Sequence, residues 1–161
     1  MTKILFFCSP IGLGHATRDL AIINQMELES CKVFSGSSAI QFFQRNDIEA
    51  NDVYSPPKFE VQNGRLEKSL KWLWSYYKYY KNCKEISNDI IRKEEPELII
   101  SDEDFASIAV AQERGIPNIV ITDILETKFT SGFGAMVERK MNKTMQEMSV
   151  SYTHLTLPTK A

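Results

Sequence analysis

Residues 3–22, KILFFCSPIGLGHATRDLAI, combine an apolar run, a glycine-containing turn, a histidine and a helical pattern. The continuous apolar run over residues 4–8 is typical of a parallel strand that is covered on both faces. Gly12 and Gly14 permit backbone conformations closed to other residues and let a ligand approach the main chain. An amphipathic helical pattern follows from Thr17. We therefore predict a strand that delivers a loop and a helix N-terminus to one sheet edge, where a phosphate or a sugar can sit.

The first interpretation of these glycines, a dinucleotide-binding turn, does not fit the spacing. Thr17 replaces the third glycine of the G-x-G-x-x-G fingerprint. The acidic residue that would bind a ribose is also missing, because the next strand ends in Val33-Phe34-Ser35-Gly36. We therefore expect no nicotinamide or flavin cofactor.

The spacing Gly12-x-Gly14-His15-x-x-Arg18 instead resembles the first βα turn of glycosyltransferases of the GT-B fold. This group includes the UDP-glycosyltransferases and the transferase that adds N-acetylglucosamine to the lipid-linked peptidoglycan precursor. The G-x-G-H turn of the family is matched at Gly12, Gly14 and His15. Arg18 is the form seen in a microbial branch, whereas other members carry proline at this position.

Strand and helix patterns alternate along the rest of the chain. Further strands are expected over 29–35, 48–54, 97–101 and 118–122, and helices over 37–46, 66–93, 105–114 and 135–148. A polar loop is expected over 58–65. This alternation predicts an α/β fold with a doubly wound, Rossmann-like parallel sheet, in the common strand order 3-2-1-4-5. The resemblance implies the N-terminal half of a GT-B fold.

In that strand order, ligands bind outside the carboxyl ends of the first and fourth strands, where the order reverses. Those ends are Ser9 and Asp102, so the topology places His15 within reach of Asp102. A sugar hydroxyl is a poor nucleophile, and a neutral imidazole whose second nitrogen is held by a carboxylate is suited to activate it. Candidate substrate-binding residues at this edge are Gly12, Gly14, Arg18 and Ser9.

The fourth strand strengthens the resemblance. Residues 98–102, LIISD, precede an alanine-rich helix and a further apolar strand, as in the segment of plant-type glycosyltransferases that carries the family's aspartate. In the family, the histidine takes a proton from the acceptor hydroxyl, and the aspartate orients the ring and offsets its charge. The resemblance, which covers about residues 3–125, therefore implies that His15 is the base and Asp102 its partner.

Several alternatives remain open at this edge. Glu103, Asp104 and Asp19 are rivals of Asp102, and an acidic cluster at a strand end often only caps a helix. Arg18 either contacts a phosphate or pairs with Asp19. The two glycines either admit a substrate or simply make a tight turn. A histidine at a helix start is also found as a cap or a surface residue.

The long helix expected over 66–93 presents two different faces. A stripe at alternating steps of four and three predicts a core-facing side; it comprises Trp72, Tyr76, Tyr79, Cys83, Ile86 and Ile90. Trp74 falls instead among Lys71, Lys78 and Lys81. An aromatic among lysines outside the core stripe suits a membrane interface or a glycolipid acceptor. The alternative is that Trp74 joins the other aromatics in the core.

Composition bounds the remaining possibilities. The chain has 161 residues, 43% of them hydrophobic, enough for one domain with a sizeable core. A net charge of −2 and a pI near 5.8 argue against a nucleic-acid partner. The cysteines Cys8, Cys31 and Cys83 form no C-x-x-C pair, and we expect small buried hydrophobes in a reduced, cytoplasmic protein. We expect no metal site, no signal peptide and no membrane span, and localisation in the cytoplasm with peripheral contact at the inner face of the membrane.

The C-terminal residues are of another kind. Residues 150–159, VSYTHLTLPT, resemble the translated sequence of a transposase-type sequencing adapter. We therefore expect residues 1–149 to form an incomplete, acceptor-side glycosyltransferase domain and residues 150–161 to be a disordered, non-native tail. His15 is then the only histidine of the domain.

The resemblance implies a hexosyltransferase that moves a sugar from a nucleotide sugar, UDP-linked, to a hydroxyl acceptor such as a glycolipid. The nucleotide sugar is a co-substrate, and no other cofactor is expected. In the family a second, C-terminal domain holds most of the donor, so we expect this chain alone to be inactive. Two other functions fit the same pattern: a sugar-nucleotide epimerase of this fold, and a non-catalytic partner half of a split glycosyltransferase.

Overall fold

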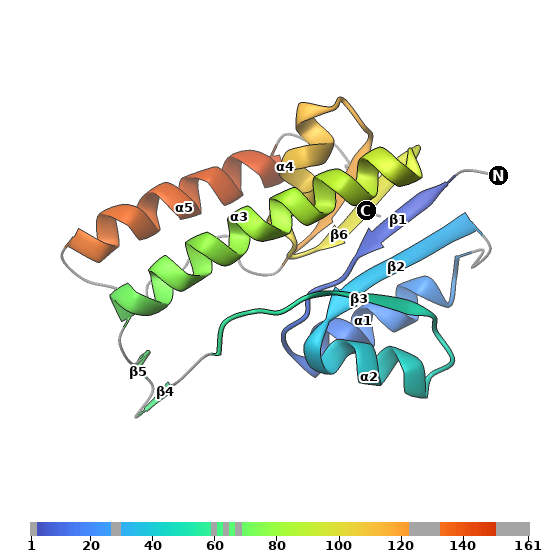
Figure 1. Cartoon of the computed structure of the whole chain (residues 1–161), viewed down its shortest axis with the longest axis horizontal. Coiled ribbons are helices and arrows are strands. Elements are labelled where there is room, and N and C mark those ends of the chain that lie inside the picture. The colour runs from blue at the N-terminus through green and yellow to red at the C-terminus, as the bar shows by residue number, and fades with distance from the viewer. Residues whose placement is uncertain are drawn as a thin grey trace, which may run out of the picture.

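The computed structural model of the chain describes residues 3–26, 30–58, 61–62, 65–66, 69–122 and 133–150. Its main feature is a parallel sheet of five strands in the order β3-β2-β1-β6-β7 (Figure 1). These strands are β3 (Ala50–Tyr54), β2 (Cys31–Gly36), β1 (Ile4–Phe7), β6 (Leu98–Asp102) and β7 (Asn118–Ile121). The predicted α/β class, the doubly wound sheet and the strand order are confirmed.

The central strand β1 separates two hydrophobic cores. Leu5 and Phe7 point to one face of the sheet, whereas Phe6 and Cys8 point to the other, and all four side chains are fully buried. Burying each such phenylalanine contributes about 1.5–3 kcal/mol relative to leaving it exposed. The uninterrupted apolar run of this strand follows from that two-sided burial.

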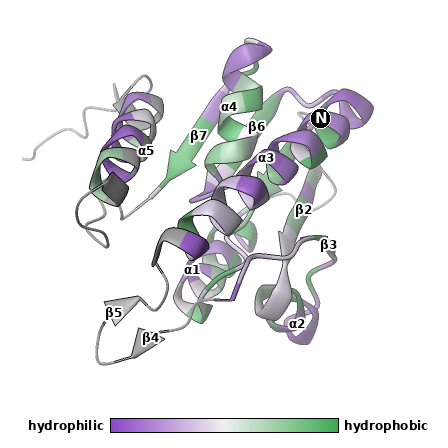
Figure 2. Ribbon diagram, turned by 60° about the vertical axis from the view of Figure 1, so that its left-hand side comes forward, coloured by the Kyte–Doolittle hydropathy of each residue, from purple (hydrophilic) through white to green (hydrophobic). Residues whose placement is uncertain are grey.

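Helices cover both faces of the sheet (Figure 1). The Leu5 face packs against α3 (Ser69–Glu94) and α4 (Phe105–Glu113). The Phe6 face packs against α1 (Leu13–Ile23) and α2 (Ser37–Arg45). Helix α5 (Phe133–Val150) packs against α4. Figure 2 shows hydrophobic green on β7, and hydrophilic purple alternating with other colours along α3.

The predicted core stripe of α3 is confirmed only in part. Cys83 is buried, and Tyr79, Ile86 and Ile90 pack against the core. Trp72 stacks on Tyr76 with ring centroids 5.0 Å apart. Sequence analysis missed two buried residues, Ser87 and Ile91, which follow Cys83 at steps of four along the same side of the helix. Trp74 is 60% exposed, so the alternative that places it in the core is wrong.

Two local predictions are corrected. Helix α1 begins at Leu13 rather than near Thr17. Its first two residues, Leu13 and Gly14, are exposed, so the amphipathic pattern in the sequence did not extend to them. Within the loop predicted over 58–65, Val61–Gln62 (β4) pairs antiparallel with Arg65–Leu66 (β5). The predicted tail lies, apart from Val150, outside the described residues.

In the part of the chain that the structure describes, no helix combines the length and the apolar character that a bilayer span requires.

Candidate active site

The site lies where β1 and β6 end side by side. Phe7 pairs with Ser101, so the next residues of both strands emerge at the same sheet edge. Asp102 is the last residue of β6, and His15 lies in the first turn of α1. The Nδ1 atom of His15 is 3.3 Å from Oδ1 of Asp102. The structure therefore brings together the two residues that sequence analysis singled out as a base and its partner.

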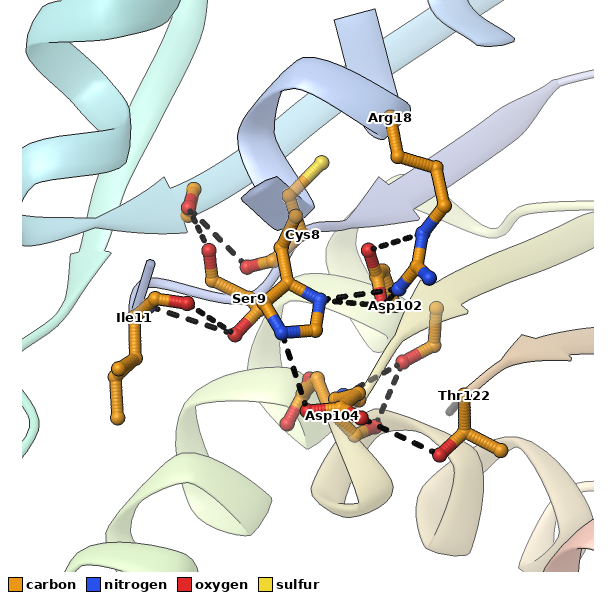
Figure 3. A network of polar contacts seen from close by, with 11 residues as sticks. Cys8, Ser9, Ile11, Arg18, Asp102, Asp104 and Thr122 are labelled. Atoms are coloured by element: carbon orange, nitrogen blue, oxygen red, sulfur yellow. Dashed lines mark hydrogen bonds and ion pairs between the residues drawn. The ribbon is translucent and has the colours of Figure 1, made fainter. Parts of the chain in front are cut away.

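Arg18 joins this pair. Its Nη2 atom donates to Oδ1 of Asp102 at 2.6 Å, and its Nε atom donates to Oδ2 at 3.3 Å (Figure 3). Asp102 is completely buried, so its charge needs a nearby cation, and the planar guanidinium suits a two-point contact. From the sequence, Arg18 was expected either to contact a phosphate or to pair with Asp19. Its contact with Asp102 was not predicted.

The contacts of His15 Nδ1 admit two positions of the ring proton. Arg18 Nη2 lies 3.0 Å from Nδ1, and a guanidinium can only donate hydrogen bonds. With the proton on Nε2, Nδ1 accepts from Arg18. With the proton on Nδ1, the ring donates to Asp102, and the lone pair of Nε2 lies on the side of the ring where Glu103 is found. General-base chemistry at Nε2 requires the second arrangement.

Glu103 lies on the other side of the imidazole. Its Oε2 atom is 3.6 Å from Nε2 of His15, and its Oε1 atom accepts a hydrogen bond from Thr122 at 3.5 Å. The backbone of Glu103 has a φ of 54°, in the left-handed region that non-glycine residues rarely adopt, at a cost of about 1–3 kcal/mol. Sequence analysis named Glu103 only as a rival of Asp102. The structure gives the two carboxylates different nitrogens of the same ring.

Asp104 is the helix cap of the acidic cluster. Its carboxylate accepts from the backbone N–H groups of Ala106 and Ser107, both at 3.3 Å, at the start of α4. Tyr54 donates to the same carboxylate at 2.8 Å. Burial raises the pKa of Asp104, and these hydrogen bonds oppose the shift. The capping interpretation thus applies to Asp104.

The turn before α1 is held by its own polar groups. The hydroxyl of Ser9 donates to the carbonyl of Ile11 at 3.3 Å and accepts from its N–H at 3.4 Å. The buried Ser35 donates to the carbonyl of Cys8 at 3.1 Å, which ties the end of β1 to β2. Ser9, a predicted substrate-binding residue, thus orders the turn.

The two glycines of the turn have different roles. Gly12 has a φ of 88°, which favours glycine, and it precedes α1 without a side chain to cap the helix. Gly14 lies within the helix and has no positive φ, so it does not use the conformational freedom that glycine permits. A Cβ atom at Gly14 would meet nothing within 4 Å, so this position leaves space beside the exposed helix N-terminus.

The cysteines do not add chemistry to the site. All three are free thiols. Burial raises the pKa of Cys31 to about 11 and that of Cys83 to about 12, which keeps both protonated and unreactive at neutral pH. Cys8 and Cys83 are buried as predicted, whereas Cys31 is half-buried. Within the described ranges, no group of three or more His, Cys, Asp and Glu side chains is arranged to hold a metal ion.

The lysine face of α3, which we define as Lys71, Trp74, Tyr77, Lys78 and Lys81, is exposed. The Trp74 and Tyr77 rings stack with centroids 5.8 Å apart. Lys78 lies over the Trp74 ring at 5.6 Å, and Lys81 lies over the Tyr77 ring at 5.1 Å. The exposed aromatic pair is therefore framed by cations.

Similarity to known proteins is confined to structure, since no family model and no curated protein matches the chain. The glycotransferase of kitacinnamycin is similar at a TM-score of 0.59 and 14% identity, over 91% of this chain and 38% of that one. A putative UDP-N-acetylglucosamine 2-epimerase from Listeria monocytogenes is similar at a TM-score of 0.59 and 11% identity, over 92% of this chain and 37% of that one. The C-terminal domain of PF1911 hydrogenase from Pyrococcus furiosus is similar at a TM-score of 0.53 and 13% identity. The match covers 74% of this chain and 91% of that one.

These likenesses show a shared fold. The five-stranded parallel sheet is Rossmann-like and matches glycosyltransferases of the GT-B fold. The chain spans less than two fifths of the length of the kitacinnamycin glycotransferase and the Listeria epimerase.

Proposed function

We propose that this chain is the acceptor-side part of a GT-B glycosyltransferase, a hexosyltransferase that uses a nucleotide sugar, UDP-linked, and a hydroxyl acceptor. The observation that carries the proposal is the contact between His15 Nδ1 and the buried Asp102 at the switch point of the sheet. A base held by a carboxylate at a ligand-binding edge is what activation of a hydroxyl requires. The resemblance of the turn and of the fourth strand supports the same assignment.

In the proposed reaction, Nε2 of His15 takes the proton of the acceptor hydroxyl. The acceptor oxygen forms a bond to the anomeric carbon, while the bond from that carbon to the diphosphate oxygen breaks with its electron pair. Asp102 holds the ring by its other nitrogen and offsets the imidazolium charge that develops. Arg18 offsets the negative charge of Asp102 in its buried position. Ser9 and Gly12 shape the turn on which the substrate lies, and Gly14 leaves space beside it at the start of α1.

Group transfer also needs a donor held against the acceptor. We assign most of the donor contacts to a second domain, because the chain spans only part of the transferase and the epimerase that share its fold. Calorimetric titration of the 161-residue chain with UDP-sugars should then show weak binding, and incubation with acceptors should show no transfer. Submicromolar binding, or transfer without an added second chain, would mean that the donor site lies within this chain.

The similarity to an epimerase keeps one other function in view. An epimerase of this fold converts one nucleotide sugar to another without an acceptor, whereas a transferase releases the nucleotide. Mass spectrometry of the products of a full-length protein distinguishes the two, since epimerisation leaves the donor mass unchanged. A partner half of a split transferase would show neither reaction until the donor-binding chain is added.

The lysine face of α3 supports a further part of the proposal, peripheral contact with the inner face of the membrane through a glycolipid acceptor. Exposed Trp74 and its neighbouring lysines match an interface of apolar chains and anionic headgroups. Binding to anionic vesicles should weaken as salt rises, and Trp74→Ala should weaken it severalfold at low salt. Met136→Ala, which removes a similarly exposed apolar side chain from α5, is the control. Absence of vesicle binding at low salt would refute this contact.

A further inference from the structure

The chain carries a second buried carboxyl group behind the His15–Asp102 pair. Asp19 lies on α1 one helical turn after His15, and it is completely buried. Among the described residues, neither oxygen of its carboxyl group has a hydrogen-bond partner. The groups that face it are Asp102 at the end of β6, the Cys8 thiol after β1, and Arg18 on its own helix. A buried polar group in this situation is costly and requires an explanation.

We propose that Asp19 holds a proton at neutral pH and, as a neutral carboxylic acid, acts as a positioning residue that supports Asp102 from behind. The proton on Asp19 follows from the buried geometry alone. Its effect on catalysis rests on the proposed function, in which Asp102 in turn orients His15.

The first argument is the balance of charge. Asp19 and Asp102 are both completely buried, and Arg18 already directs Nη2 and Nε to the Asp102 carboxylate. One guanidinium offsets one carboxylate. A second buried anion beside the first would be uncompensated, which is strongly unfavourable at low dielectric. A proton on Asp19 removes that charge.

The second argument is the hydrogen-bonding capacity of Asp102. A carboxylate offers about four acceptor positions. Oδ1 of Asp102 receives Arg18 Nη2 and His15 Nδ1, and Oδ2 receives Arg18 Nε. A protonated Asp19 supplies a donor for the remaining capacity, whereas an ionised Asp19 supplies none. Asp102 then accepts hydrogen bonds from Arg18, His15 and Asp19. These contacts fix the orientation of the carboxylate that His15 Nδ1 contacts.

The electrostatic surroundings agree with this arrangement. Burial and the neighbouring Asp102 raise the pKa of Asp19 to about 8, while the hydrogen bond with Cys8 and the charge of Arg18 act in the opposite direction. Burial also raises the pKa of the Cys8 thiol well above its usual value, so that this neighbour stays protonated. Among the described residues that face Asp19, Arg18 is thus the group that brings a positive charge.

The first test is the pH dependence of unfolding, measured by denaturant titration of the 161-residue chain. The pKa of Asp19 is about 8 in the folded state and near its usual value of 3.8 in the unfolded state, so folding takes up a proton between these values. Stability from this group is fully present below about pH 4 and is lost as pH rises to about 8. The folded-to-unfolded ratio should fall by up to about tenfold per pH unit in this window.

The matched variant is Asp19→Asn, which has almost the same shape, is neutral and still offers an N–H donor to Asp102. It should lack this pH-dependent loss of stability. Asp104, whose pKa is raised, and Glu94, whose pKa is lowered, contribute equally to both proteins, so the difference isolates Asp19. Identical pH dependence in the two proteins would overturn the proposal.

A second measurement needs no variant to fold. Infrared spectra of the unmodified chain should contain the carbonyl band of a protonated carboxylic acid that disappears with a midpoint near pH 8. Absence of this band at neutral pH, which would mean that all carboxyl groups are already ionised, would contradict the proposal. In an active full-length protein, Asp19→Asn should keep turnover and extend it to higher pH, whereas Asp19→Leu should lower kcat with little change in KM. If the infrared band titrates but these kinetic effects are absent, Asp19 carries the proton and its positioning role is rejected.

Discussion

Replacement of His15 by alanine in an active full-length protein should lower turnover on the order of 10²-fold or more, the usual scale for loss of a general base. The physical reason is that Nε2 is the atom left to take the acceptor proton once Nδ1 donates to Asp102. KM for the acceptor should change much less than kcat, because the loss affects the transition state. Steady-state kinetics with saturating donor measures both constants.

The same experiment tests whether the pair acts as a unit. Asp102→Asn should also lower turnover, and the double variant should lose little more than His15→Ala alone, because each partner needs the other. Thr17→Ala is the control on the same helix, since its exposed hydroxyl donates to the carbonyl of Leu13, away from the His15–Asp102 pair. Near-normal turnover of His15→Ala would refute the base, and additive losses would refute the coupling.

Gly36→Ala should destabilise the protein by about 3 kcal/mol or more, as expected for a clash that side-chain motion cannot relieve. A Cβ atom at Gly36 would lie 1.8 Å from the carbonyl oxygen of Tyr54 and 2.6 Å from its carbonyl carbon. Gly36 ends β2, at the point where its register with β3 shifts, so the clash would push the two strands apart. Denaturant unfolding followed by circular dichroism measures the effect.

Gly14→Ala is the matched control for this prediction. Gly14 lies in a helix with nothing within 4 Å of its missing Cβ, so alanine should change stability by no more than about 1 kcal/mol and in the stabilising direction. The same variant should weaken substrate binding if this open space admits the substrate. Equal stability of the two alanine variants would show that β2 and β3 do not approach as closely as the structure has them.

Displacement of Tyr54 would also disturb the sheet edge near the site. The Tyr54 hydroxyl contacts Ser87 on α3 and Asp104 at the start of α4, both at 2.8 Å. These contacts connect an outer strand to the loop that follows Asp102. A shift of Tyr54 caused by a side chain at position 36 would therefore reach the loop after Asp102, the residue that contacts His15.

The arrangement of the sheet could be predicted from local patterns in the sequence. Apolar runs such as residues 4–8, separated by helical patterns, predict a parallel sheet because only two-sided burial accommodates them. Since the carboxyl ends of neighbouring parallel strands share an edge, strand order alone was enough to place His15 near Asp102. These inferences hold because the pattern that carries them is local and periodic.

The role of each charged residue in the site, in contrast, could not be predicted before the folded arrangement was known. Glu103, Asp104 and Asp19 are equivalent rivals of Asp102 in sequence, yet Glu103 faces His15 Nε2 and Asp104 caps α4. Asp19 is buried, and its carboxyl oxygens have no hydrogen-bond partner among the residues that the structure describes. The partner of Arg18, Asp102, likewise lies on a strand that is distant in the sequence. The physical reason is that the role of a carboxyl group depends on burial and on the nearest charge, and both are set by contacts between segments distant in sequence.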